Sequence, residues 1–134
     1  MKSLFMAFVF FLASLEAQNI SWYGDFEQAR QKAIEERKTL MVLLIKKECF
    51  ACDEILSKTF RSDSVVERVN ELFVSVLISE GQKGTYPIEM LYTMEYPAVF
   101  FLDNQELFVG KNIFGYLDSD EFVKRLNLYF SPQR

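Results

Sequence analysis

Short apolar runs alternate with amphipathic segments along most of this chain. Three runs, Leu40–Ile45, Phe73–Ile78 and Ala98–Leu102, are almost wholly apolar and only five or six residues long. Runs of this length and composition predict strands, and the first, which Lys46 and Lys47 close, predicts a strand that is buried on both faces of a sheet. Charged residues return at helical spacing between the runs, so we expect helices to connect the strands.

Two of these amphipathic segments begin with a helix-capping signal. Asp25 opens the segment that ends at Lys38, and Gln28 follows it three residues later, as in a capping box. Asp118 opens the segment that ends at Tyr129, with Glu121 at the third position. Both segments are therefore predicted to be helices.

The remaining segments complete a predicted mixed sheet. We expect helices at 53–60 and 64–72, a loop at 79–86, a short helix or turn at 88–94, and a hairpin turn at 103–106 that leads into a strand at 107–109. Strand–helix–strand crossovers favour parallel pairing, and the late hairpin is antiparallel. The pattern predicts an α/β domain whose central mixed sheet has four or five strands, with helices on both faces and residues 40–45 in the middle.

Composition sets limits on function. The chain has 134 residues, of which 50% are hydrophobic, and this suits one packed domain. Its formal net charge is −4 and it has no basic stripe, which argues against nucleic acid as a partner. The chain has no histidine, so it lacks the most common general base and metal ligand.

The first residues are typical of a secretory signal. Lys2 precedes an apolar run from Leu4 to Leu15. The run is too short to cross a bilayer core, for which a helix needs roughly 20 apolar residues. Cleavage after Ala17 would leave residues 18–134 as the mature domain, in a compartment where disulfides persist. A buried first helix and an uncleaved membrane anchor are the alternatives.

The two cysteines, Cys49 and Cys52, stand three residues apart between a predicted buried strand and a predicted helix. A helix N-terminus favours a thiolate at Cys49, and Cys52 is one turn away, where it can reach the sulfur of Cys49. A structural disulfide across so short a loop would stabilise little. A zinc site needs further ligands, and a c-type haem site needs His where the chain has Asp53. The pair is therefore predicted to be redox-active, with Cys49 as the nucleophile.

A second feature is the Tyr96-Pro97 dipeptide, which directly precedes the apolar run at 98–102. Proline is tolerated at the first residue of a strand, and X-Pro bonds adopt the cis form at modest cost. From position alone, an ordinary loop proline and a cis proline at a functional site both remain open.

These residues resemble the thioredoxin superfamily over about residues 20–130. The chain is most similar to the C-terminal thioredoxin-like domain of the transmembrane disulfide reductases of bacterial periplasms, and to related small exported proteins. The resemblance rests on Trp22 and on four motifs, which are Cys49-Phe50-Ala51-Cys52, Thr59-Phe60, Tyr96-Pro97 with the run to Asp103, and Phe114-Gly115-Tyr116-Leu117-Asp118. It implies a thioredoxin fold.

The resemblance also implies roles for single residues. Cys49 would be the nucleophile and Cys52 the resolving thiol. Pro97 would be a cis proline that faces the disulfide, and the backbone of Tyr96 would pair with a bound substrate strand. The chain departs from the family at Glu48, where members usually carry Trp, and at Leu43, where thioredoxins place a buried Asp.

The functional hypothesis is an exported thiol–disulfide oxidoreductase that reduces, or relays electrons to, the disulfides of other exported proteins. We expect a monomer in the periplasm or outside the cell, without a bound cofactor. Its electron donor would be a membrane disulfide reductase. The alternative hypothesis is a thioredoxin-fold binding module or chaperone with little redox turnover.

Overall fold

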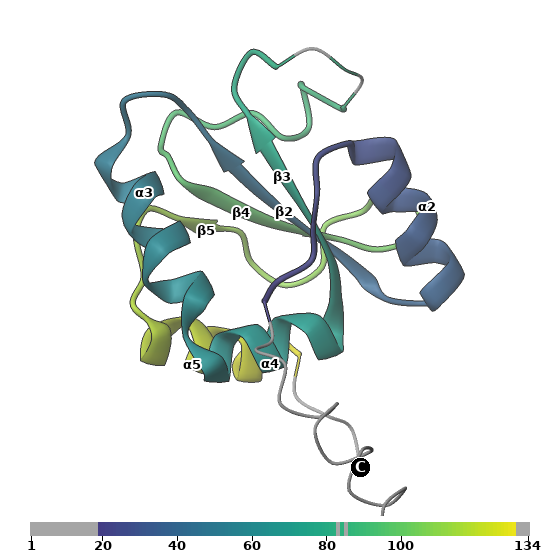
Figure 1. Ribbon diagram of the computed structural model, residues 1–134. Coiled ribbons are helices and arrows are strands. Elements are labelled where there is room, and N and C mark those ends of the chain that lie inside the picture. Colours follow the sequence, from purple (N-terminus) through teal and green to yellow (C-terminus); the bar gives the residue numbers. More distant parts are fainter. Residues whose placement is uncertain (1–18, 83, 85, 131–134) are drawn as a thin grey trace, which may run out of the picture.

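Strand β2, Thr39–Ile45, is the centre of a five-stranded sheet whose order is β1-β3-β2-β4-β5. The computed structural model describes residues 19–82, 84 and 86–130, so the predicted signal segment 1–17 lies outside the described residues (Figure 1). The other strands are β1 (Trp22–Tyr23), β3 (Phe73–Ser79), β4 (Ala98–Leu102) and β5 (Ile113–Phe114). The helices are α2 (Phe26–Glu36), α3 (Phe50–Ser57), α4 (Asp63–Leu72) and α5 (Ser119–Tyr129), with a 3-10 turn at Thr59–Arg61.

The pairing of β2 explains why its sequence is apolar throughout. It runs parallel to β3, with Val42 opposite Val76, and antiparallel to β4, with Val42 also opposite Phe100. Its five inner residues are all buried. A strand with a neighbour on each side and a packed layer on each face has no surface for polar side chains. The predicted central position of residues 40–45, and the two flanking strands, are confirmed.

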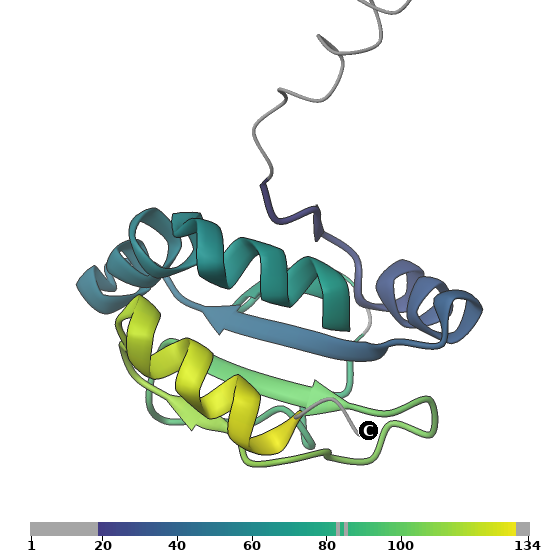
Figure 2. The same cartoon turned by 90° about the horizontal axis from the view of Figure 1, so that it is seen from below.

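Side chains of β2 alternate between two apolar clusters, one on each face of the sheet. Met41 and Leu43 point into the cluster under α3, α4 and α5, whereas Leu40, Val42 and Leu44 point into the cluster under α2 (Figure 1). Helices α4 and α5 lie next to each other on their face (Figure 2), where Arg68 of α4 donates to Asn127 of α5 at 3.0 Å. The predicted helices on both faces are confirmed.

The helix starts follow the predicted caps. The Asp25 carboxylate accepts from the Gln28 backbone N–H at 2.9 Å, and the Asp118 carboxylate accepts from that of Glu121 at 2.9 Å. Each bond satisfies one of the free N–H groups of a helix start. Helix α3 begins three residues before the predicted Asp53, because Cys49 itself occupies the capping position.

The edges of the sheet differ from the prediction in two details. Strand β1 was not predicted, because two residues carry no periodicity. Residues 107–109 do not form a full strand; Phe108 makes only a single bridge to Leu102, and the chain reaches its paired strand β5 after a turn at Gly110. Leu107 and Phe108 are 58% and 45% exposed, so an apolar pair here does not mark a buried strand.

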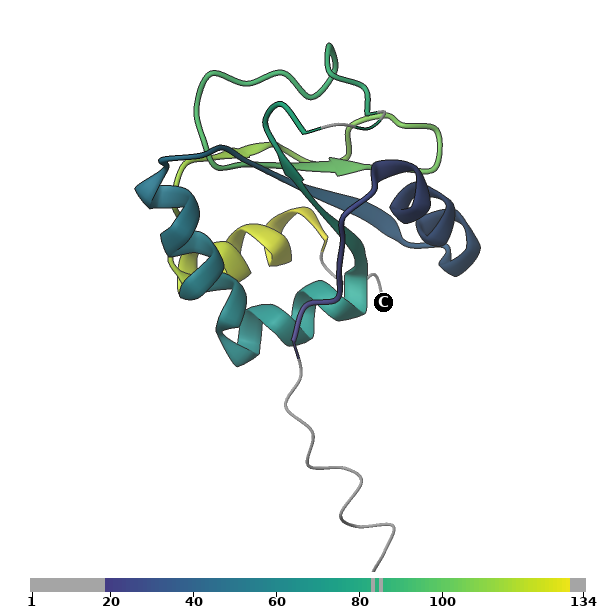
Figure 3. The same ribbon diagram turned by 45° about the horizontal axis from the view of Figure 1, so that its top comes forward.

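The β3–β4 connection, residues 80–97, contains no helix among its described residues. Residues 88–94 form turns, one of the two predicted outcomes. The connection arches over the end of the sheet towards which β2 and β3 point (Figure 3). None of the helices in residues 19–130 that the structure describes is long and apolar enough to cross a membrane.

Candidate redox site

Cys49 and Cys52 form a disulfide at the start of α3. Their Cα atoms are 5.2 Å apart, and the Cys49 sulfur accepts the Cys52 backbone N–H at 3.1 Å. Cys49 is partly exposed, whereas Cys52 is 1% exposed. Cys49 is therefore the outer member of the pair and Cys52 the inner one.

The start of α3 favours a negative charge on the Cys49 sulfur. The free N–H groups of the first turn and the helix dipole both stabilise a thiolate. Four charged side chains flank it in sequence, namely Lys46, Lys47, Glu48 and Asp53, and none of the four forms an ion pair within the described part of the chain. The helix start is therefore the fixed electrostatic feature of the site.

Glu48 has a left-handed backbone conformation, with φ of 53°. This conformation costs a residue with a side chain about 1 kcal/mol or more. It turns the chain from the end of β2 into α3, and it places Cys49 at the helix cap rather than in the strand. The structure thus gives the residue at the family's usual tryptophan position a backbone role.

The Tyr96-Pro97 peptide bond is cis, as the resemblance implied, and Pro97 is buried. Ala98 pairs with Leu44 near the end of β2, so the proline lies at the sheet end from which the chain enters α3. The Lys46 ammonium is 5.1 Å from the centre of the Tyr96 ring, which is within cation–π range. This contact connects the segment before Cys49 with the loop that ends at Pro97, which we call the proline loop.

Tyr96 offers free main-chain groups at the same end of the sheet as the start of α3. Its backbone N–H and C=O form no hydrogen bond with any described residue, whereas the neighbouring turn is closed by Thr93, whose hydroxyl donates to the Glu95 carbonyl at 2.8 Å. Burial, with Glu80 as a further cause, raises the pKa of the Tyr96 phenol. The phenol therefore stays neutral at physiological pH, and its backbone is available to pair with an extended segment.

Gly115 fixes the other side of the proline loop. Its N–H donates to the Pro97 carbonyl at 2.8 Å, and its φ is +81°, in the left-handed region. A Cβ at this position would lie 2.9 Å from the Glu95 carboxylate. Glycine is favoured here because side chains rarely adopt this left-handed conformation, while the Glu95 carboxylate, at the end of a flexible side chain, could move aside.

We expect Gly115→Ala to destabilise the fold by about 1–2 kcal/mol, since alanine is strained at this φ and displaces Glu95. Thermal unfolding followed by circular dichroism measures the effect. Gly24→Ala is the matched control, because a Cβ there meets nothing within 4 Å and the backbone is not left-handed. Equal midpoints for the two variants would contradict the assignment.

Thr59 ties the end of α3 to the segment after β5. It is completely buried, and its hydroxyl donates to the Leu117 carbonyl at 2.5 Å. The bond spans 58 residues of sequence and holds the loop that carries Gly115. The Thr59-Phe60 motif was quoted for the family resemblance, but no sequence pattern indicated this partner.

Replacing Thr59 by Val keeps the branched shape but leaves the Leu117 carbonyl without its buried donor. We expect a loss of about 1–3 kcal/mol in the free energy of unfolding, measured by urea denaturation. Thr59→Ser retains the hydroxyl and should lose less. A Val variant as stable as the Ser variant would show that the bond contributes nothing.

Large apolar side chains are exposed next to Cys49, before the proline loop and after β5. Phe50, directly after Cys49, is 77% exposed, and Met94, before the proline loop, is 85% exposed. Phe114 and Tyr116, on either side of Gly115, are 45% and 37% exposed. Large exposed apolar groups are a feature of protein interaction sites when they form a patch.

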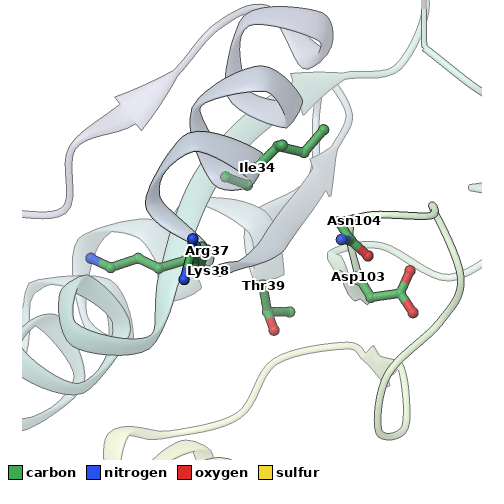
Figure 4. Close-up of a pocket in the computed structure, with 7 residues that line it drawn as sticks. Ile34, Arg37, Lys38, Thr39, Asp103 and Asn104 are labelled. Carbon is green, nitrogen blue, oxygen red and sulfur yellow. The ribbon is translucent and has the colours of Figure 1, made fainter.

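A hollow lies beside Thr39, at the end of β2 that is far from Cys49 (Figure 4). It has a volume of about 500 Å³ and lies between the segment that follows α2, at Arg37 to Thr39, and Asp103 and Asn104 of the hairpin, while the Lys38 side chain points away from Asp103. The seven residues of β2 separate it from Cys49, roughly 20 Å along the strand. It is therefore not part of the redox site. Within the described residues, no group of three or more potential side-chain ligands could hold a metal ion.

Comparison with known proteins identifies the class. Residues 21–104, more than half of the chain, match the family described as thioredoxin-like. The chain belongs to this thioredoxin-like family. No curated protein sequence matches it.

Solved structures share the fold at low sequence identity. The oxidoreductase DsbH superposes with a TM-score of 0.73 at 13% identity and covers 90% of each chain. A putative disulphide-isomerase from Bacteroides thetaiotaomicron gives 0.71 at 21% identity, over 89% of this chain and 99% of that one. The oxidised C-terminal domain of DsbD from Neisseria meningitidis gives 0.64 at 18% identity, over 81% and 99%. The protein thus has a thioredoxin-like disulfide oxidoreductase fold with a Cys49–Cys52 disulfide.

Proposed function

We propose that this protein is an exported thiol–disulfide oxidoreductase that reduces disulfides of other exported proteins. The observation that carries the proposal is the Cys49–Cys52 disulfide, with Cys49 partly exposed at a helix start and Cys52 buried behind it. The Tyr96-Pro97 loop at the same end of the sheet supports it.

The reaction proceeds by two exchanges. In the reduced protein, the Cys49 thiolate attacks one sulfur of the partner's disulfide, and the other partner sulfur leaves as a thiolate. Cys52 then loses its proton and attacks the Cys49 sulfur, which forms the internal disulfide and releases the second partner thiolate. Two electrons pass to the partner, and the two leaving thiolates take up protons.

The proline loop and the helix start support different parts of this reaction. The free N–H and C=O of Tyr96 hold the partner as an extended strand, and the first turn of α3 stabilises the Cys49 thiolate. A dithiol donor, such as a membrane disulfide reductase, restores the reduced pair. The signal segment at 1–17 directs the domain to the compartment where its substrates carry disulfides.

A turnover assay tests the proposal. A fluorescent peptide with a quencher attached through a disulfide is mixed with dithiothreitol and catalytic amounts of the protein, and the fluorescence increase is recorded. Wild type should accelerate release severalfold over dithiothreitol alone, and the Cys49→Ser/Cys52→Ser double variant should not. Equal rates for the two proteins would refute the redox function.

The exposed Phe50 and Met94 favour a second candidate function, a binding module or chaperone that holds unfolded partners. This function does not need the cysteines. If the double variant suppresses aggregation of a denatured protein as well as wild type does, and neither accelerates disulfide release, the second candidate replaces the first.

A further inference from the structure

Lys46 connects two segments of the redox site that are far apart in the sequence. It follows β2 directly, at a point where the Glu80 N–H donates to the Ile45 carbonyl at 2.7 Å. Its ammonium lies over the Tyr96 ring, 5.1 Å from the ring centre. Because Cys49 is only three residues further on, the contact joins the segment that carries the nucleophile to the segment proposed to pair with a partner.

The Tyr96 ring is the partner of this cation. Within the described residues, the Lys46 ammonium forms no hydrogen bond and no ion pair. Burial, with Glu80 as a further cause, raises the pKa of the Tyr96 phenol, so the ring is neutral at physiological pH and attracts the cation through its face. Tyr96 also packs against the apolar cluster under α2. The ring thus contacts both the core of the domain and the segment before Cys49.

The backbone of Tyr96 has few other constraints. It ends a connection that contains no helix among its described residues, and its own N–H and C=O form no hydrogen bond with any of them. The nearest main-chain bond holds the Pro97 carbonyl to the Gly115 N–H. A side-chain contact therefore relates the Tyr96 backbone to the Cys49 segment. Small displacements matter there, since disulfide exchange needs the reacting sulfurs close together and aligned.

We propose that Lys46 is a positioning residue, which holds the Tyr96 ring and thereby sets the distance between the Cys49 sulfur and a partner strand paired with Tyr96. The inference rests on the proposed function, since it assigns a residue to the same reaction. Lys46 touches neither sulfur and acts through Tyr96. Its effect is therefore limited to partners with a peptide backbone, because a small disulfide reaches Cys49 without pairing to Tyr96.

Two disulfide substrates test this role. One is an uncharged peptide whose single cysteine carries a leaving group through a disulfide, and the other is bis(2-hydroxyethyl) disulfide, which has no peptide group. Acid quenching, alkylation of the remaining thiols and mass spectrometry measure the second-order rate constant for attack by the reduced full-length protein. Lys46→Met should slow the peptide reaction about threefold, as loss of one exposed cation–π contact would give, and leave the small disulfide unchanged.

Further variants separate the contact from the charge. Lys46→Arg should restore the peptide rate, because a guanidinium also binds an aromatic face. Lys47→Met is the matched control, since it removes the same charge from an exposed neighbour that has no described partner, and both of its rates should equal those of wild type. Tyr96→Leu should slow the peptide reaction, and adding Lys46→Met to it should cost nothing further. Circular dichroism checks folding, and Lys46→Gln replaces Lys46→Met if the latter does not fold.

The outcomes distinguish this role from the proposed function. A peptide rate in Lys46→Met equal to that of wild type, or a further loss when Lys46→Met is added to Tyr96→Leu, would overturn the positioning role and leave the redox function intact. An equal loss for both substrates would show that Lys46 acts on Cys49 by its charge, and it would also overturn the role. Failure of wild type to react with either disulfide would overturn the proposed function, and the role of Lys46 with it.

Discussion

The variants Cys49→Ser and Cys52→Ser are expected to fail in different ways. Cys49→Ser should lose turnover and form no covalent complex, because Cys52, which is 1% exposed, cannot reach a partner disulfide. Cys52→Ser should lose turnover but accumulate mixed disulfides, because Cys49 still attacks and no thiol remains to release the partner. The expected loss of turnover is at least a hundredfold in both variants.

Non-reducing electrophoresis, followed by mass spectrometry of the trapped species, measures this difference. The double Cys49→Ser/Cys52→Ser variant is the control for complexes that do not involve either sulfur. Comparable trapping by the two single variants would show that the order of attack is wrong. The partners captured by Cys52→Ser would also identify the physiological substrates.

The second large effect concerns Leu43, which occupies the position where thioredoxins carry a buried Asp. Leu43 is completely buried and packs in the same cluster as Ile55 of α3. Leucine accepts no proton, and burial disfavours a charged thiolate at Cys52. We therefore expect slow resolution of the mixed disulfide near pH 7, with a rate that rises as pH approaches the ordinary thiol value of about 8.5.

A Leu43→Asp variant should resolve the mixed disulfide about tenfold faster at pH 7, because the carboxylate supplies a general base. It should also lose about 3–5 kcal/mol of unfolding free energy, since a polar group replaces an apolar side chain in the core. Leu43→Asn is the matched control, because it carries the same packing cost without a titratable group. Stopped-flow decay of the mixed disulfide against pH, and urea denaturation, measure both effects.

Two results would contradict this account. A flat pH profile in wild type would mean that another group already accepts the proton, with Glu48 and Glu54 the nearest carboxylates in sequence. Equal resolution rates in folded Asp and Asn variants would show that the carboxylate does not act as a base at this position.

Local sequence signals predicted most of the fold. The strand at 98–102 has the predicted bounds, and β2 and β3 differ by one residue each, because a strand buried on both faces must be apolar throughout. The caps at Asp25 and Asp118 were predictable because a capping side chain bonds three residues ahead. The cysteine pair was predictable because a spacing of three residues brings both cysteines onto one helical turn.

The features that sequence did not reveal join segments far apart in the chain. The Thr59–Leu117 hydrogen bond, the Lys46–Tyr96 contact and the approach of Gly115 to Glu95 each depend on the complete sheet. No periodicity or spacing encodes such partners. The start of α3 was misplaced because cysteine is an uncommon cap, and only the geometry after Glu48 shows that Cys49 fills this position.

The place of β4 in the sheet has a consequence for how the chain assembles during synthesis. A nascent chain that ends at Ser79 already contains β1, β2 and β3. In this chain β2 can pair with β3, and α3 and α4, which connect the two strands, can pack on the sheet. The other edge of β2 remains open until β4 arrives. An open apolar edge recruits other strands, so a chain truncated before Ala98 is expected to aggregate rather than persist as a smaller soluble domain.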